Sequence, residues 1–279
     1  MAYMFSEDIS LKELDLGNFI TSSATDMTRI FYSCGNLTSI NLKTFDTKNV
    51  VLMHGMFSGC KSLTSLDIRH FNTIRVTSIS SMFENCISLK SIDVSNFDTK
   101  EVSAINNIFS NCASLTSIYI KNFNLTNIRD ITRFFSGCSS LKSVDLSNWN
   151  TGNLVHMTFL FNECTSLETV NFKGFNTAKV TSFYNIFKNC HSLKSLDLSM
   201  FETSQVRDLT SMFQNCYSLE SIDLSNFKTN LINTMAYLFD NCRRLKRVNL
   251  SGFQTSAIKN MDRMFTKCSS LETIGYIYV

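Results

Sequence analysis

The chain has 279 residues, of which 44% are hydrophobic and 18% charged, a composition typical of a folded globular protein that excludes intrinsic disorder. A net charge of +3 and scattered basic residues argue against a nucleic-acid partner. No apolar run reaches the roughly eighteen residues that a membrane span needs, and the first residues show no signal peptide.

A repeat of 26 residues dominates the sequence from its beginning. Phe5, Asp8 and Leu11 already stand in the register that the later units keep. Each later unit places phenylalanine three residues before a cysteine and leucine three residues after it. The cysteines are Cys34, Cys60, Cys86, Cys112, Cys138, Cys164, Cys190, Cys216, Cys242 and Cys268. Because the register holds without insertion or composition shift, we predict one domain, residues 1–279, of about ten and a half repeats.

The first predicted element of each unit is a short strand. In the unit that begins at Cys86, the apolar residues Ile92 and Val94 flank a polar one, and Leu89 precedes them. This alternation favours a strand with one buried face. Phe97 follows after a short bend and is also expected to point inward. Stacked units would then align their strands in a parallel sheet.

The second predicted element is a short helix that returns along the other face. Val102, Ile105, Ile108 and Phe109 have the spacing of one helical face, and Thr99 stands where an N-cap hydroxyl begins a helix. Glycine occurs only nine times, which argues against a fold built on tight glycine turns. The sequence therefore predicts a curved α/β solenoid of the leucine-rich-repeat type, with a parallel strand sheet on one face and short helices on the other.

The repeated phrase M-F-x-x-C-x-S-L-x-S-L-D-L-S-N-F-x-T, nearly complete in residues 212–229, resembles the BspA-like leucine-rich repeat of bacterial surface proteins. The resemblance covers essentially the whole chain. It implies a location at the cell surface or outside the cell, an adhesin-like role in binding protein or glycan, and neither catalysis nor a cofactor. The signal peptide, anchor and capping units that surface members carry are not recognisable in this sequence.

The cysteine column has a chemical and a structural interpretation. Ten cysteines in a secreted protein can form disulfides, but equal spacing provides no pairing rule, and Asp8 occupies the same column. We therefore expect a ladder of small, buried, reduced thiols that fills space between neighbouring turns. A metal site is not expected, because no C-x-x-C pair occurs and the four histidines occupy different repeat positions.

Departures from the repeat mark candidate binding residues on the outward strand face. Aspartate and asparagine form a column there, which hydrogen bonding between turns explains more simply than calcium or glycan binding. Tyr119 replaces aspartate in this column. Arg69, Lys121 and Lys173 replace serine two positions further on, and His70 lies beside Arg69. We predict a ligand-contact patch from these five residues; the alternative is ordinary drift at tolerant surface positions.

The last residues suggest a second kind of contact. Tyr276, Ile277, Tyr278 and Val279 form an apolar strand with no helix after it, and an uncovered strand edge pairs readily with another chain. The chain is then either a fragment of a longer protein or a subunit that stacks end to end. The leading prediction is a non-enzymatic surface module whose partner is a protein or glycan on another cell or matrix. The alternative is a self-assembling structural protein that forms filaments or layers.

Overall fold

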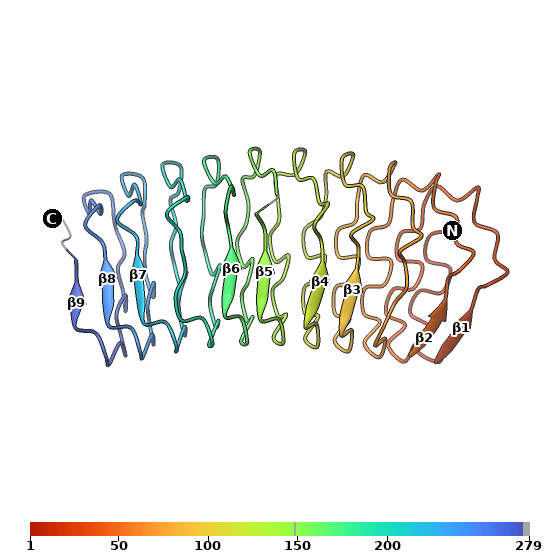
Figure 1. The fold of residues 1–279 in the computed structure, drawn as a ribbon, viewed down its shortest axis with the longest axis horizontal. Helices are drawn as coiled ribbons and strands as arrows, with labels where there is room; N and C mark the ends of the chain where they lie inside the picture. Colours follow the sequence, from red (N-terminus) through yellow and green to blue (C-terminus); the bar gives the residue numbers. More distant parts are fainter. Residues whose placement is uncertain (148, 276–279) are drawn as a thin grey trace. The chain divides into compact units, whose positions relative to one another are not determined.

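A computed structural model of the chain describes residues 1–147 and 149–275 (Figure 1). The chain divides into two compact units, the first formed by Met1–Ile128 with Phe134–Leu141 and the second by Arg129–Arg133 with Lys142–Val279. Each unit is a parallel β-solenoid, in which a strand residue pairs with the residue one repeat later, as Glu13 does with Ser39. Whether the chain is one domain stays a prediction from the sequence.

The strands are three residues long or shorter and lie where the sequence predicts them. The first unit contains β1 (Glu13–Asp15) paired with β2 (Ser39–Asn41), and β3 (Ser91–Asp93) paired with β4 (Ser117–Tyr119). The second unit contains β5 (Ser143–Asp145) paired with β6 (Thr169–Asn171), followed by β7 (Ser221–Asp223), β8 (Arg247–Asn249) and β9 (Thr273–Ile274). All of these pairs are parallel, which confirms the predicted sheet.

The predicted helices on the other face are wrong, because the described residues contain no helix. Every second backbone N–H there bonds to the next turn of the solenoid, and those between close short turns within the segment, as Glu84 N–H does with Ser81 O at 3.1 Å. Phe83 N–H donates to Ile108 O at 3.0 Å, and Asn85 N–H donates to Ser110 O at 2.8 Å. Ser81 and Asn85 have φ of 56° and 60°, values that no α-helix tolerates. The segment therefore turns tightly, and the spacing of its apolar residues imitates a helical face.

Left-handed residues recur twice in each turn, five residues and one residue before the cysteine. Glycine supplies three of them, Gly55, Gly59 and Gly137. Asparagine is the commonest of the others; its short polar side chain tolerates this conformation well. The tight turns are therefore built mainly on residues other than glycine. Asparagines one residue before the cysteine also form an amide ladder, in which Asn215 Nδ2 donates to Asn189 Oδ1 at 2.7 Å.

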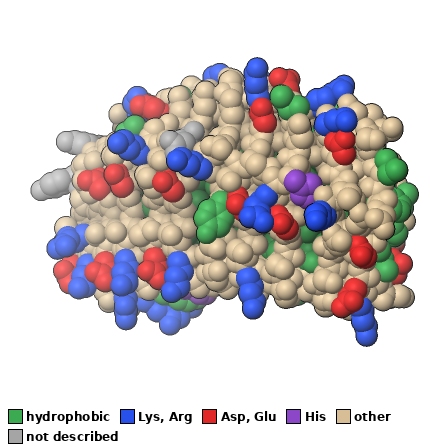
Figure 2. Space-filling view, turned by 45° about the vertical axis from the view of Figure 1, so that its right-hand side comes forward, with side chains coloured by type: hydrophobic (Ala, Val, Ile, Leu, Met, Phe, Trp, Pro, Cys, Tyr) green, Lys and Arg blue, Asp and Glu red, His purple; other side chains and the backbone are tan. Residues whose placement is uncertain are grey.

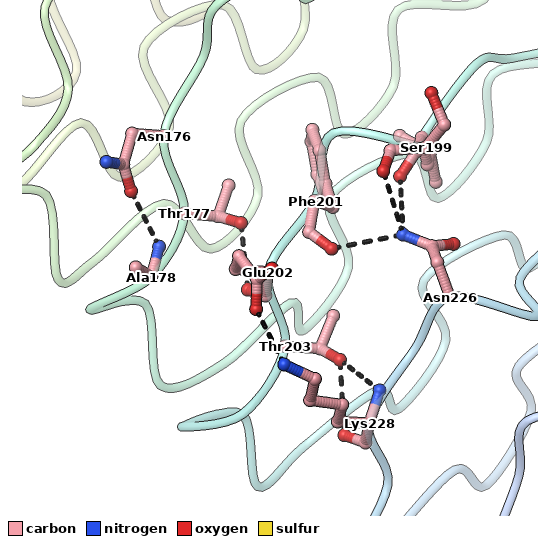
Figure 3. Close-up of polar contacts among 10 residues, drawn as sticks. Asn176, Thr177, Ala178, Ser199, Phe201, Glu202, Thr203, Asn226 and Lys228 are labelled. Carbon is pink, nitrogen blue, oxygen red and sulfur yellow. Dashed lines mark hydrogen bonds and ion pairs between the residues drawn. The ribbon is translucent and has the colours of Figure 1, made fainter.

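The repeated threonines do not cap helices, contrary to the prediction, but join neighbouring turns. Thr203 Oγ1 donates to Lys228 O at 3.1 Å and accepts the N–H of the same Lys228 at 2.6 Å (Figure 3). Thr177 likewise donates to Glu202 O at 2.8 Å. These hydroxyls are buried, so each one satisfies backbone groups that water does not reach. We call this pair of bonds the threonine staple.

Stacked aromatic rings form the centre of each unit. In the first unit the rings of Phe57 and Phe83 lie 5.9 Å apart and within 3° of parallel. In the second unit Phe213 stacks on Phe187 at 5.7 Å and on Phe239 at 5.5 Å. All five side chains are fully buried. The phenylalanine column is therefore a structural spine and not a surface for stacking ligands.

Candidate functional site

The outward aspartates and asparagines of the strand face end each strand with a local turn. Asp223 Oδ1 accepts the N–H of Ser225 at 2.8 Å, and Asn249 Oδ1 accepts the N–H of Ser251 at 3.1 Å. Hydrogen bonds from the side chain and backbone of Ser225 lower the pKa of Asp223. The column is thus explained by turn formation. Among the described residues, no group of histidine, cysteine and acidic side chains could hold a metal ion.

The strand face of the first unit contains a notch where the strand pattern is interrupted. No strand forms at residues 65–67, between β2 and β3. A cavity of about 310 Å³ lies there, lined by Ser65, Leu66, Asp67, Arg69, Ser91 and Asp93. Hydroxyl, carboxylate and guanidinium groups therefore face one opening, an arrangement suited to polar contacts with a partner.

The second unit contains a similar notch beside its own interruption at residues 195–197. Its cavity of about 350 Å³ is lined by Val170, Asn171, Phe172, Lys173, Asp197, Ser199 and Met200. Phe172 replaces a smaller aliphatic residue of the repeat, and its ring packs edge-on against Phe201 at 5.0 Å. Met200 is 55% exposed, so this notch has a more apolar rim than the first.

The structure places the predicted patch residues in different settings. The Arg69 guanidinium donates two hydrogen bonds to Asp67, Nε to Oδ1 and Nη2 to Oδ2, both at 2.9 Å. This ion pair lowers the pKa of Asp67 to about 2, yet the Arg69 side chain stays 69% exposed. His70 Nε2 lies 3.0 Å from Leu42 O, and its ring meets Phe71 edge-on.

Tyr119 is the most prominent aromatic side chain of this face in the first unit. It is 56% exposed on β4 and lies directly across from Asp93 of β3, a residue that lines the first notch. Lys121 is exposed two residues further on. Lys173 belongs to the second unit and lines the second notch. Of the five residues, only Arg69 lines the first notch and only Lys173 the second, and their role in binding stays a prediction.

A family comparison decides the relationship of the chain to known proteins. The model of the family described as "Mycoplasma protein of unknown function, DUF285" matches residues 1–119, 104–222 and 182–275, which overlap along nearly the whole sequence. The chain belongs to this family. The match to DUF285 repeats, together with the first solved structure below, confirms the resemblance to BspA-like leucine-rich repeats.

Solved structures similar to this DUF285 chain are bacterial leucine-rich repeat proteins. A leucine-rich repeat protein from Bacteroides ovatus is 21% identical with a TM-score of 0.57, covering 97% of this chain and 68% of that one. A leucine rich cell surface protein from Faecalibacterium prausnitzii is 20% identical with a TM-score of 0.40, covering 99% and 75%. The first likeness supports the leucine-rich-repeat fold. The comparison with curated proteins finds no match.

The cysteines of the DUF285 chain line the interior as a column of free thiols. Nine are fully buried, Cys268 is partly exposed, and none of the ten forms a disulfide in this structure. The thiols donate to backbone carbonyls, as Cys86 Sγ does to Phe57 O at 3.2 Å. Burial raises the pKa of the Cys86 thiol well above its usual value. That the cysteines are reduced in the native protein stays a prediction, and the buried column agrees with it.

Sequence reasoning missed a basic turn in the second unit of this DUF285 chain. Arg243, Arg244, Lys246 and Arg247 stand together and are all exposed. Arg244 interrupts a column that is serine in nine other turns, and Arg247 interrupts a column otherwise almost entirely serine or threonine. Comparing the columns one by one would have revealed both departures.

Two further predictions concern self-association and membrane spans. The self-association residues Tyr276, Ile277, Tyr278 and Val279 lie outside the described residues, so end-to-end assembly stays a prediction. Within residues 1–147 and 149–275, no helix is long and apolar enough to cross a membrane.

Proposed function

We propose that the chain is a non-enzymatic binding module that holds a protein partner on its strand face, at a cell surface or outside the cell. The pair of notches carries this proposal. Each notch interrupts an otherwise regular row of short strands and presents polar and charged side chains at an opening of about 310 or 350 Å³. Such openings receive protruding side chains of a partner.

The chemistry of the first notch favours a protein over a glycan. Arg69 and Tyr119 are residue types that dominate the energetics of protein–protein interfaces, and both are more than half exposed. Asp67 holds the Arg69 guanidinium in place, so little side-chain freedom is lost when a partner binds. The leucine-rich-repeat fold also supports an adhesin-like role, and so does the likeness to the cell surface protein from Faecalibacterium prausnitzii.

The double variant Arg69→Ala/Tyr119→Ala tests the proposal. The purified chain is applied to an array of extracellular-matrix proteins and glycans, and the affinity for each bound protein is then measured by surface plasmon resonance. We expect the double variant to bind at least about tenfold more weakly, because two interface anchors are lost. Arg75→Ala, which removes an exposed arginine outside both notches, should bind like the wild-type chain.

Equal binding by the double variant and the wild-type chain would exclude the first notch as the binding site. Binding confined to glycan spots would overturn the choice of a protein partner.

A further inference from the structure

The basic turn defined above, Arg243, Arg244, Lys246 and Arg247, departs from the repeat in a way that stability does not explain. Serine at the position of Arg244 bonds to the preceding turn elsewhere, as Ser192 Oγ does to Thr165 O at 2.9 Å. Arg244 does not form that hydrogen bond. Four adjacent positive charges also repel one another, so the substitution favours an external ligand over the fold.

One member of the basic turn is fixed by its neighbours. Arg243 Nε donates to Asn241 Oδ1 at 2.8 Å, and its guanidinium lies 5.1 Å from the centre of the Tyr217 ring. Tyr217 stacks in turn on His191 at 4.4 Å. This column of three side chains borders the basic turn and gives it a rigid edge.

The other members of the basic turn have no ionic partner in the part of the chain that the structure describes. Among the described residues, the side chains of Arg244, Lys246 and Arg247 have neither a hydrogen bond nor an ion pair in this structure, and all three are exposed. A cavity of about 260 Å³ lies beside them, lined by Glu220, Arg244, Lys246 and Ser270. Its size suits one or two carboxylate groups.

The charges on the neighbouring turns restrict which anions fit. Lys246 lies between Glu220 and Glu272, as the bonds Lys246 N–H to Glu220 O and Glu272 N–H to Lys246 O show, both at 2.9 Å. Acidic and basic side chains accordingly lie side by side toward the C-terminal end in Figure 2. A long polyanion that crossed the turns would meet both glutamates. A protein segment with a short acidic centre and basic flanks matches the pattern.

We propose that the basic turn binds a short acidic segment of a protein partner, with Arg244 and Arg247 as the principal contacts. A guanidinium binds carboxylate through two parallel hydrogen bonds, and Lys246 adds a third positive charge at the cavity. The flanking Glu220 and Glu272 select for basic residues on either side of the acidic centre. This inference rests on the proposed protein-binding function and names the chemistry of the partner.

The test uses the full chain and a fluorescein-labelled peptide, KGEDEGK, in fluorescence anisotropy at low salt. We expect saturable binding that weakens as salt rises from about 0.05 M to about 0.5 M, because screening shortens the reach of the charges. Arg244→Ser and Arg247→Ser restore the repeat's own residue and should each weaken binding about tenfold or more. Arg207→Ser, an exposed arginine elsewhere in the second unit, is the matched control.

Three outcomes would overturn the inference. They are no saturable binding of KGEDEGK, equal binding of the peptide KGQNQGK, which keeps the lysines but lacks the acidic centre, or unchanged affinity in both serine variants. Dextran sulfate that binds the same arginines more tightly than the peptide would replace the inference with a polyanion site. Because the array test of Arg69 and Tyr119 concerns the first unit, its result distinguishes failure of this inference from failure of the proposed function.

Discussion

Replacing Phe213 with alanine should lower the free energy of unfolding of the second unit by about 3–5 kcal/mol. The Phe213 ring is fully buried and stacks on Phe187 and Phe239, so the substitution opens a cavity between two turns at once. In a repeat protein each turn is stabilised mainly by its neighbours, and this site disrupts both interfaces of one turn. Urea denaturation followed by far-UV circular dichroism measures the loss.

Phe265→Ala provides the matched control in the same column. Phe265 is only partly buried and stacks on Phe239 at 5.5 Å. Its removal should therefore cost clearly less than the removal of Phe213. Equal losses at the two positions would show that the aromatic column is not the spine described here.

Replacing Thr203 with valine should lower the free energy of unfolding by about 2–4 kcal/mol, although the two side chains have nearly the same shape. The change removes the threonine staple and leaves the N–H and C=O of Lys228 without their partner beside the buried side chain of residue 203. Each orphaned backbone group costs about 1–3 kcal/mol. The same urea titration measures this effect.

Thr169→Val is the control for the staple. Thr169 lies exposed on β6, where a β-branched side chain of either kind suits the strand, so the expected change is within about 0.5 kcal/mol. If Thr203→Val were as mild as this control, the reciprocal bonds to Lys228 would contribute little to stability.

The positions of the strands could be predicted from the sequence for a simple reason. A strand alternates inward and outward residues, and Ile92, Asp93 and Val94 show that alternation directly. The constant spacing of the cysteines then required each turn to repeat the last. Parallel stacking with a register of one repeat followed without knowledge of any side-chain contact.

The return segment was misread because local spacing alone does not distinguish a helix from a tight, left-handed turn. Ile105, Ile108 and Phe109 point inward in the structure, as predicted, so their spacing was correct evidence for burial. The decisive information lay in Asn107 and Asn111, whose positive φ values break any helix. Asparagine directly before the cysteine, which recurs in five repeats, was the available signal.

The candidate site was only partly accessible to sequence analysis. Tyr119 and Arg69 were recognised as departures from their columns. The notches were not recognised. Whether a strand forms depends on the exact backbone positions, and the sequences of residues 65–67 and 195–197 do not differ in kind from those that form strands. The ion pair between Arg69 and Asp67 likewise depends on side-chain geometry.

The far-UV circular dichroism spectrum of the folded chain tests the central claim most directly, namely that both faces of each turn are held by bonds between turns and that no helix is present. We predict a spectrum dominated by strand and turn, without the paired minima of an α-helix, and with no helical signal lost during urea unfolding. A spectrum with clear helical minima would contradict this account and restore the short helices that the apolar spacing suggested.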